Sequence, residues 1–283
     1  RQMCIRDRNN IILLVSAVSS AVKMPVNASI THGFGGLMIN IKYDLNTIDE
    51  KRALIKNKLF ERSANIKSED FNRISEEDLY ILYELYDEIF LNGWFKQNFK
   101  GNIKFILSRQ LTRSAGNTKT GKNIAQLKPE DIKFEVKISV NHLINFNKVD
   151  RRKYAGGIEA HSVTDGLMLV FEHELCHVIE FLLCCKSSCR KKPFKDLIFN
   201  LFGQTESTHE LVGADELNAL KFGLKPGDNV CFKYNGKRMN GFIQRINKRA
   251  TVMCPDKNGR YIDKSGRRYK KYYASPESLL KSD

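Results

Sequence analysis

The sequence has no pair of C-x-x-C elements. Its seven cysteines are an odd number, and three of them are grouped at Cys184, Cys185 and Cys189. This arrangement argues against a zinc ribbon, and it differs from the disulfide framework of a small secreted protein. We therefore expect reduced thiols and an intracellular protein, placed in the nucleus, the cytoplasm or the nucleoid.

Long apolar runs are also lacking. The apolar stretch 11–22 resembles the core of a signal peptide, but it is too short to span a membrane. The residues before it look like a translated sequencing adapter, and Met24 could be the natural start. We therefore interpret 1–23 as an artefact or a leader and 24–70 as a partly ordered N-terminal arm. We expect a monomer without a membrane anchor.

Acidic residues are scarce near the C-terminal end. Residues 221–283 contain 16 Lys and Arg against 5 Asp and Glu, which gives +11 of the total net charge of +15. A basic module beside a nearly neutral body indicates a polyanionic partner, DNA or RNA. The alternative is a basic tail that serves only solubility.

The same segment has a strand pattern. Short apolar runs at 230–234, 241–246 and 251–254 are separated by turns, and Asn235-Gly236 is typical of a tight hairpin. This spacing predicts a small all-β barrel, SH3-like or Tudor-like, over 221–283. Basic residues alternate there with Tyr and Phe, a combination that suits phosphate contact and base stacking. The candidates for nucleic-acid contact are Lys233, Lys237, Arg238, Arg245, Lys248, Arg249, Arg267, Arg268, Lys270 and Lys271.

Histidine is rare, with six residues, yet two of them form an H-E-x-x-H motif at 173–177. The motif lies in the apolar stretch 167–183, which predicts a buried helix. Positions i and i+4 share one face of a helix, so His173 and His177 can bind one metal ion. Glu174 can then take a proton from a zinc-bound water. The alternative is a core helix whose two histidines are simply hydrogen-bonded.

The body of the chain predicts an α+β domain over 71–220. A helix begins at the cap Ser75 and ends at Asn92-Gly93, and strands are expected at 103–108 and 134–140. The motif helix follows, and another helix is expected over 194–202.

This series of elements resembles the SprT-like metalloprotease family, which includes the Spartan-type proteases of DNA–protein crosslink repair. The resemblance implies a zincin-like catalytic domain, a zinc ion and a protein substrate associated with nucleic acid. It covers about half of the chain, from 78 to 211. The residues that carry it are 79–90 with Asn92-Gly93-Trp94, 111–116, 136–140, 171–180, Phe194-Lys195 and 200–203.

The sequence departs from the family at the third zinc ligand. The family has a His four residues before the Phe that matches Phe194, and Arg190 stands there. Arginine stays protonated and does not bind zinc. Three alternatives remain open: Cys189 is the third ligand, His209 is the third ligand, or the site is degraded or misread.

Two functions follow from these alternatives. The first is a zinc-dependent endopeptidase in which Glu174 is the catalytic residue and His173, His177 and Cys189 hold the metal. In it, Glu180 could orient one of the ligands. The second is a protein that has lost its metal and acts as a nucleic-acid-binding module. Arg190 favours the second function, and the H-E-x-x-H series favours the first.

Overall fold

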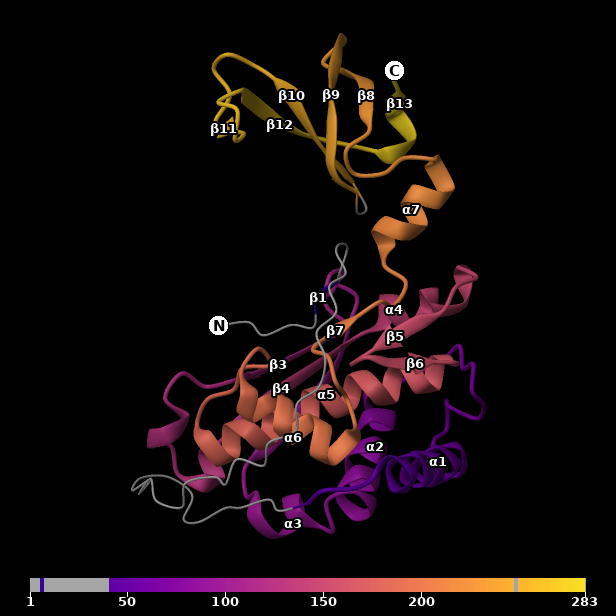
Figure 1. Cartoon of the computed structure of the whole chain (residues 1–283), viewed down its shortest axis with the longest axis vertical. Coiled ribbons are helices and arrows are strands. Elements are labelled where there is room, and N and C mark those ends of the chain that lie inside the picture. The colour runs from indigo at the N-terminus through magenta and orange to yellow at the C-terminus, as the bar shows by residue number, and fades with distance from the viewer. Residues whose placement is uncertain (1–5, 8–40, 247–248, 283) are drawn as a thin grey trace, which may run out of the picture. The chain divides into compact units, whose positions relative to one another are not determined.

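The computed structural model describes residues 6–7, 41–246 and 249–282, which form two compact units (Figure 1). The first unit contains the described residues up to Ile144 together with Arg152–Leu211, and the second contains Asn145–Arg151 and the residues from Val212 onward. The boundary therefore lies earlier than the expected one at 220. Helix α7 (Ala214–Phe222) belongs to the second unit, where Glu216 accepts two hydrogen bonds of 2.7 Å from Arg151.

The first unit is an α+β structure. Its larger sheet has the order β2-β4-β3, in which β2 (Asn102–Ser108) runs parallel to β4 (Lys133–Ser139) and β3 (Gly116–Thr120) runs antiparallel to it. The predicted strands at 103–108 and 134–140 are thus confirmed, whereas β3 was not predicted. A smaller sheet has the order β1-β7-β5-β6 and consists of Arg6–Asp7, Thr208–His209, Lys153–Ala155 and Ile158–Ala160.

The predicted helices of this unit are present. Helix α2 (Glu76–Ile89) begins with a capping box between Ser75 and Asp78, and the motif helix is α5 (Val163–Cys184). Helix α5 packs along β3 and β4, and α6 (Lys192–Phe202) packs against α5 (Figure 1). Two short helices, α3 (Trp94–Asn98) and α4 (Val140–Asn145), complete the unit.

The described part of 24–70 contains a long helix that packs on the first unit. Helix α1 (Leu45–Arg62) packs against α2 and buries Ile48, Ile55 and Leu59. Its Arg52 donates hydrogen bonds of 2.8 and 2.7 Å to Glu172 of α5, a fully buried carboxylate. Helix α1 is therefore held in the first unit by its buried apolar residues and by the ion pair between Arg52 and the buried Glu172. Residues 24–40, and 1–23 apart from β1, lie outside the described residues.

The second unit contains the predicted strands in an antiparallel sheet of order β11-β12-β10-β9-β8-β13. A core of ten buried residues, including Val230, Ile243 and Val252, lies on one side of it. The expected barrel does not close: within the part of the chain that is described, β11 and β13 remain edges. Each has two residues and offers few backbone groups for a closing pair. The strands are Asn229–Tyr234 (β8), Lys237–Ile246 (β9), Ala250–Pro255 (β10), Tyr261–Ile262 (β11), Arg268–Ala274 (β12) and Leu280–Lys281 (β13).

Among the helices in the described ranges, none combines the length and the apolar character needed to cross a membrane.

Candidate functional site

Helix α5 and the loop after it bring three potential metal ligands together. His173 and His177 lie one turn apart on α5, and Cys189 lies in the loop between α5 and α6. One ligand atom from each residue lies within 4.8 Å of the other two, and all three side chains are buried. Tetrahedral zinc with bonds of about 2.0–2.3 Å needs ligand atoms about 3.5 Å apart, so shifts of roughly 1 Å would close the site.

Both imidazoles are held in the form that binds metal. Burial lowers the pKa of His177 to about 3, and burial together with the charges of His177 and His209 lowers the pKa of His173 well below its ordinary value. The rings are therefore neutral, with a lone pair available. Nε2 of His177 and both ring nitrogens of His173 have no hydrogen-bond partner although they are fully buried. A cation between them would satisfy these atoms, so the residues present fit a metal.

Ser187 determines which nitrogen of His177 faces the ligand group. Its hydroxyl donates to Glu180 Oε2 at 2.5 Å and lies 2.6 Å from His177 Nδ1. Because the Ser187 hydroxyl donates its only proton to Glu180, it can only accept a hydrogen bond from His177. His177 therefore carries its proton on Nδ1, and its lone pair is at Nε2. The backbone N–H of Ser188 also donates to Glu180 Oε2, at 2.8 Å. Glu180 thus anchors the loop that carries Cys189 and reaches His177 through Ser187.

The neighbouring residues separate the alternatives for the third ligand. Arg190 is exposed to solvent, whereas Cys189 is buried beside the two histidines. Phe194, the first apolar residue of α6, packs on both imidazoles, with centroid distances of 5.0 Å to His173 and 4.4 Å to His177. His209 is not a member of the ligand group. Of the two protein ligands considered, the structure brings Cys189 to the site.

Glu174 lies against strand β3. Its Oε2 accepts a hydrogen bond of 2.6 Å from the hydroxyl of Thr118, and its Oε1 is buried without a partner. Burial raises the pKa of Glu174 to about 8, although the Thr118 hydroxyl acts in the opposite direction. A nearby cation would lower this pKa again. A carboxylate that titrates near neutral pH can accept and return a proton.

A second pair of buried histidines adjoins this site. The rings of His142 and His209 are 4.8 Å apart and nearly perpendicular. His142 Nδ1 lies 2.8 Å from the hydroxyl of Ser139, whose backbone N–H donates to Ala115 just before Gly116. Burial lowers the pKa of His142 to about 4 and that of His209 to about 3, so both rings are neutral.

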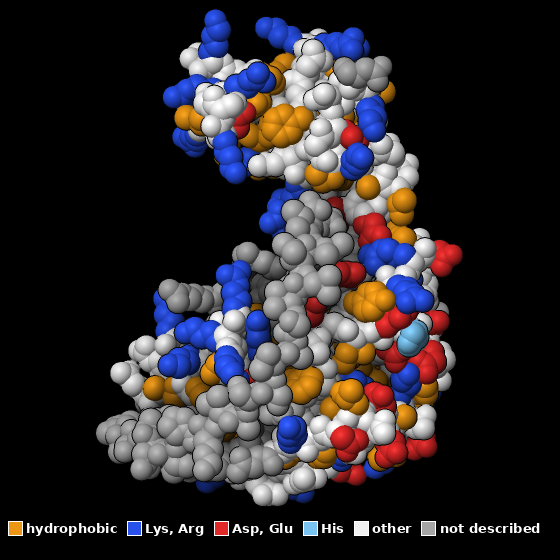
Figure 2. All heavy atoms as spheres, in the orientation of Figure 1, with side chains coloured by type: hydrophobic (Ala, Val, Ile, Leu, Met, Phe, Trp, Pro, Cys, Tyr) orange, Lys and Arg blue, Asp and Glu red, His pale blue; other side chains and the backbone are white. Residues whose placement is uncertain are grey.

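The basic candidates of the second unit are spread over its sheet. Lys233, Arg238, Arg245 and Lys271 lie on the side opposite the core, and Lys237, Arg268 and Lys270 lie on the core side. Figure 2 shows that Lys and Arg account for most of the charged side chains over these strands. Arg249 and Arg267 lie in turns, and Lys248 lies outside the described residues. Lys270 is paired with Asp256 at 2.8 Å.

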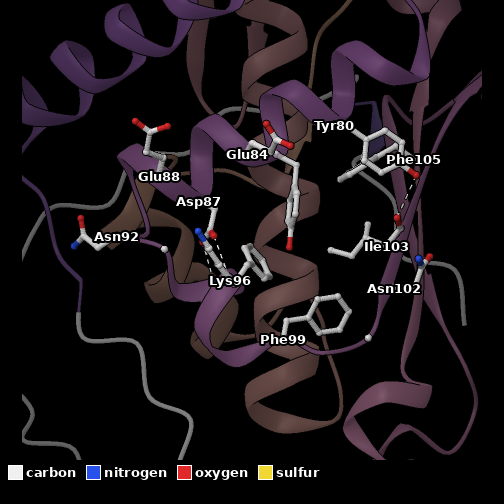
Figure 3. Close-up of a pocket in the computed structure, with 14 residues that line it drawn as sticks. Tyr80, Glu84, Asp87, Glu88, Asn92, Lys96, Phe99, Asn102, Ile103 and Phe105 are labelled. Carbon is white, nitrogen blue, oxygen red and sulfur yellow. Dashed lines mark hydrogen bonds between the residues drawn. The ribbon is translucent and has the colours of Figure 1, made fainter.

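A separate pocket of about 940 Å³ lies between α2, α3 and β2 (Figure 3). Tyr80 and Phe99 are among its lining residues, whereas His173, His177 and Cys189 are not. Its two glutamates already have partners in α1, because Glu88 is paired with Lys58 at 3.0 Å and Glu84 is paired with Arg62. The rim therefore has little uncompensated acidic charge.

Two contact residues could not be found from the sequence. Thr118 and Ser187 are hydroxyl residues that belong to no motif. Thr118 is 56 residues from its partner Glu174, and Ser187 is 10 residues from its partner His177, beyond the end of α5. The one available signal is the position of Ser187, two residues before Cys189 and directly after the motif helix.

Comparison with family models, with curated proteins and with solved structures finds no match to this chain. The likeness to SprT-like proteases therefore rests on the motifs in the sequence.

Proposed function

We propose that the chain is a zinc-dependent endopeptidase of the SprT-like type that acts on proteins associated with nucleic acid. The observation that carries the proposal is the position of Glu174, whose Oε1 is buried without a partner on the helix that holds His173 and His177, next to Cys189 in the following loop. A carboxylate base next to two neutral imidazoles and a cysteine that can bind as the thiolate is suited to metal-assisted hydrolysis of a peptide bond.

Zinc suits this donor set better than a hard cation does. One thiolate and two imidazoles are soft to borderline ligands, and zinc sites that combine cysteine with histidine are chemically well founded. When bound, zinc would polarise a carbonyl group and lower the pKa of a water molecule. His173, His177 and Cys189 would hold the ion, and Ser187 would keep Nε2 of His177 directed toward it.

The residues around the ion supply the remaining chemistry. Glu174 would accept the proton of the attacking water at Oε1 and return it to the leaving amine, while Thr118 holds Oε2 in place. Phe194 covers the two imidazoles and excludes water from that side. The charge that Glu174 carries would be offset by the nearby cation, which favours its ionised form at neutral pH.

Strand β3 supports a polypeptide substrate. Among the described strands it pairs with β4 alone; Asn117 and Thr118 are buried, and the end of the strand at Lys119 and Thr120 is partly exposed. Thr118 lies in the middle of β3 and bonds to Glu174. A peptide paired with the partly exposed end of β3 would lie near the Glu174 carboxylate, with affinity from backbone hydrogen bonds and little dependence on sequence.

The second unit supplies the targeting role in this proposal. Its strands contain Lys and Arg but no Asp or Glu, so it favours a polyanion, DNA or RNA. None of the six described cysteines forms a disulfide, which suits the reducing interior of a cell.

Replacement of Glu174 tests the proteolytic part. The zinc-loaded protein should cleave a fluorescently labelled, unfolded casein, and Glu174→Gln should reduce the rate by a factor of about 100 or more while the melting temperature changes little. Glu88→Gln, at an exposed ion pair, serves as the control and should be fully active. Undiminished cleavage by Glu174→Gln would sink the assignment.

A second candidate function is a nucleic-acid-binding protein without catalysis. The observation that favours it is Arg190, which stands where the resemblance expects a third histidine and is exposed to solvent. A protein that binds nucleic acid, holds no zinc and cleaves nothing would support this candidate instead.

A further inference from the structure

The two faces of the sheet in the second unit differ in chemistry. Side chains alternate along each strand, so the pairing register assigns every residue to one face. We name the side opposite the core of Val230, Ile243 and Val252 the outer face. The pairings of β8 with β9, of β9 with β10 and of β10 with β12 show which residues lie on the outer face. They are Lys233, Arg238, Phe242, Arg245, Thr251, Met253, Tyr269, Lys271 and Tyr273.

Aromatic and basic side chains lie next to one another on the outer face. One cross-strand row consists of Arg245, Thr251 and Tyr273, and the next consists of Phe242, Met253 and Lys271. Nζ of Lys271 lies 4.2 Å from the ring centre of Tyr261, which pairs with Tyr269 at the edge of the sheet. Tyr273 and Tyr261 are 54% and 40% exposed, so a ligand can reach part of each side chain.

No acidic residue opposes these cations within the strands. The sequences of β8 to β13 contain no Asp or Glu. The acids of the unit lie in turns, where several have partners: Asp256 is paired with Lys270, and Asp263 accepts from the hydroxyl of Tyr269 at 2.9 Å. The basic side chains of the outer face therefore favour a polyanion around a middle where Thr251, Met253 and Tyr269 are buried.

We propose that the outer face binds a single-stranded nucleic acid, with its phosphates on Lys233, Arg238, Arg245 and Lys271 and its bases stacked on Tyr261 and Tyr273. This inference rests on the targeting part of the proposed function and names the form of the partner. Exposed rings on a sheet can stack on unpaired bases, whose faces are free, whereas a duplex hides those faces.

Binding by the full chain tests this inference directly. The protein carries Glu174→Gln, so that cleavage cannot interfere, and the probes are fluorescent oligo-dT and oligo-U of about 20 nucleotides and a duplex of equal length. Anisotropy is recorded over a range of salt concentrations. Both single strands should bind about tenfold more tightly than the duplex, and a duplex that binds equally well would overturn the inference.

Variants then locate the site. Tyr261→Ala and Tyr273→Ala should each weaken single-strand binding about tenfold without changing the salt dependence. Lys271→Ala should weaken it and also reduce the salt slope by about one. Should Tyr273→Ala prove unstable, Tyr273→Leu keeps the apolar bulk and removes the ring.

Matched controls are available on the core side of the same sheet. Tyr234, 46% exposed, and Lys237 pair with each other at the end of β8 and β9, on that other face. Tyr234→Ala and Lys237→Ala should change affinity less than about twofold. Equal losses from both faces would contradict the inference. The cleavage assay is independent: a chain that binds strands as described but never cleaves protein contradicts the protease alone.

Discussion

A methyl group on the α-carbon of Gly116 would lie 2.3 Å from Oε1 of Glu174. Strand β3 therefore touches the carboxylate of Glu174, and the close approach requires glycine. Gly116→Ala should displace Glu174 and reduce proteolysis by a factor of about 100, with about 1–3 kcal/mol of destabilisation from overpacking. The rate of casein cleavage and the melting temperature measure the two effects.

Gly121, just beyond the end of β3, provides the control. A methyl group there would lie 3.8 Å from Leu127 Cδ1, an ordinary contact, so Gly121→Ala should leave activity unchanged. If Gly116→Ala is as active as Gly121→Ala, the position of the Glu174 carboxylate against β3 does not matter for proteolysis, which would contradict this account.

Ser187→Ala should weaken metal binding by about 10- to 100-fold, because His177 loses the acceptor that fixes its tautomer. Competition with a chromophoric chelator measures the affinity, and the ¹⁵N shifts of His177 in the metal-free protein report which nitrogen carries the proton. Ser188→Ala is the control, since the contact of Ser188 with Glu180 comes from its backbone N–H. Equal metal affinities of the two variants would contradict the role of Ser187 in orienting His177.

Arg52→Met should destabilise the first unit by about 3–5 kcal/mol, because it leaves the buried Glu172 without its cation. The remaining partners of Glu172, the hydroxyl of Tyr86 at 2.9 Å and the amide of Gln204 at 2.9 Å, cannot offset a full charge. Urea unfolding gives the value. Lys58→Met, at an exposed pair, should cost less than about 1 kcal/mol, and a similar cost for both variants would disagree with this account.

The buried His142 predicts a loss of stability in acid. Its pKa is about 4 in the folded protein and about 6.5 when exposed, so the unfolded state binds the proton more readily between these values. The contribution of His142 is fully present above pH ~6.5 and is lost as the pH falls toward 4, by about 1.4 kcal/mol per pH unit. In metal-free protein, the free energy of unfolding of His142→Asn should therefore fall less steeply with decreasing pH than that of the parent protein. Parallel curves from chemical unfolding would refute this.

The elements with strong periodicity could be predicted from the sequence, and those shaped by tertiary contacts could not. The apolar pattern of 167–183 and the cap at Ser75 act locally, so α5 and α2 were found. Strand β3 has the sequence Gly-Asn-Thr-Lys-Thr and no alternation of apolar residues, because its order comes from pairing with β4. The packing of α1 on the first unit could not be predicted, because nothing in the sequence pairs Arg52 with its buried partner Glu172.

The candidate site was predictable in part for the same reason. The spacing of His173 and His177 on one helix follows from helical geometry alone. The choice between Cys189 and His209 depends on the path of the loop after α5, which Ser187 and Ser188 anchor on Glu180. No local pattern encodes that path.

Zinc content per chain tests the central claim most directly. The purified protein, measured by inductively coupled plasma mass spectrometry, should hold about one zinc ion, since Cys231 and Cys254 of the second unit are too few for a site of their own. Cys189→Ala should fall well below one, while Cys184→Ala, at an exposed cysteine, should remain near one. A parent protein with almost no zinc, or a Cys189→Ala variant that keeps it, would contradict the His173, His177 and Cys189 site.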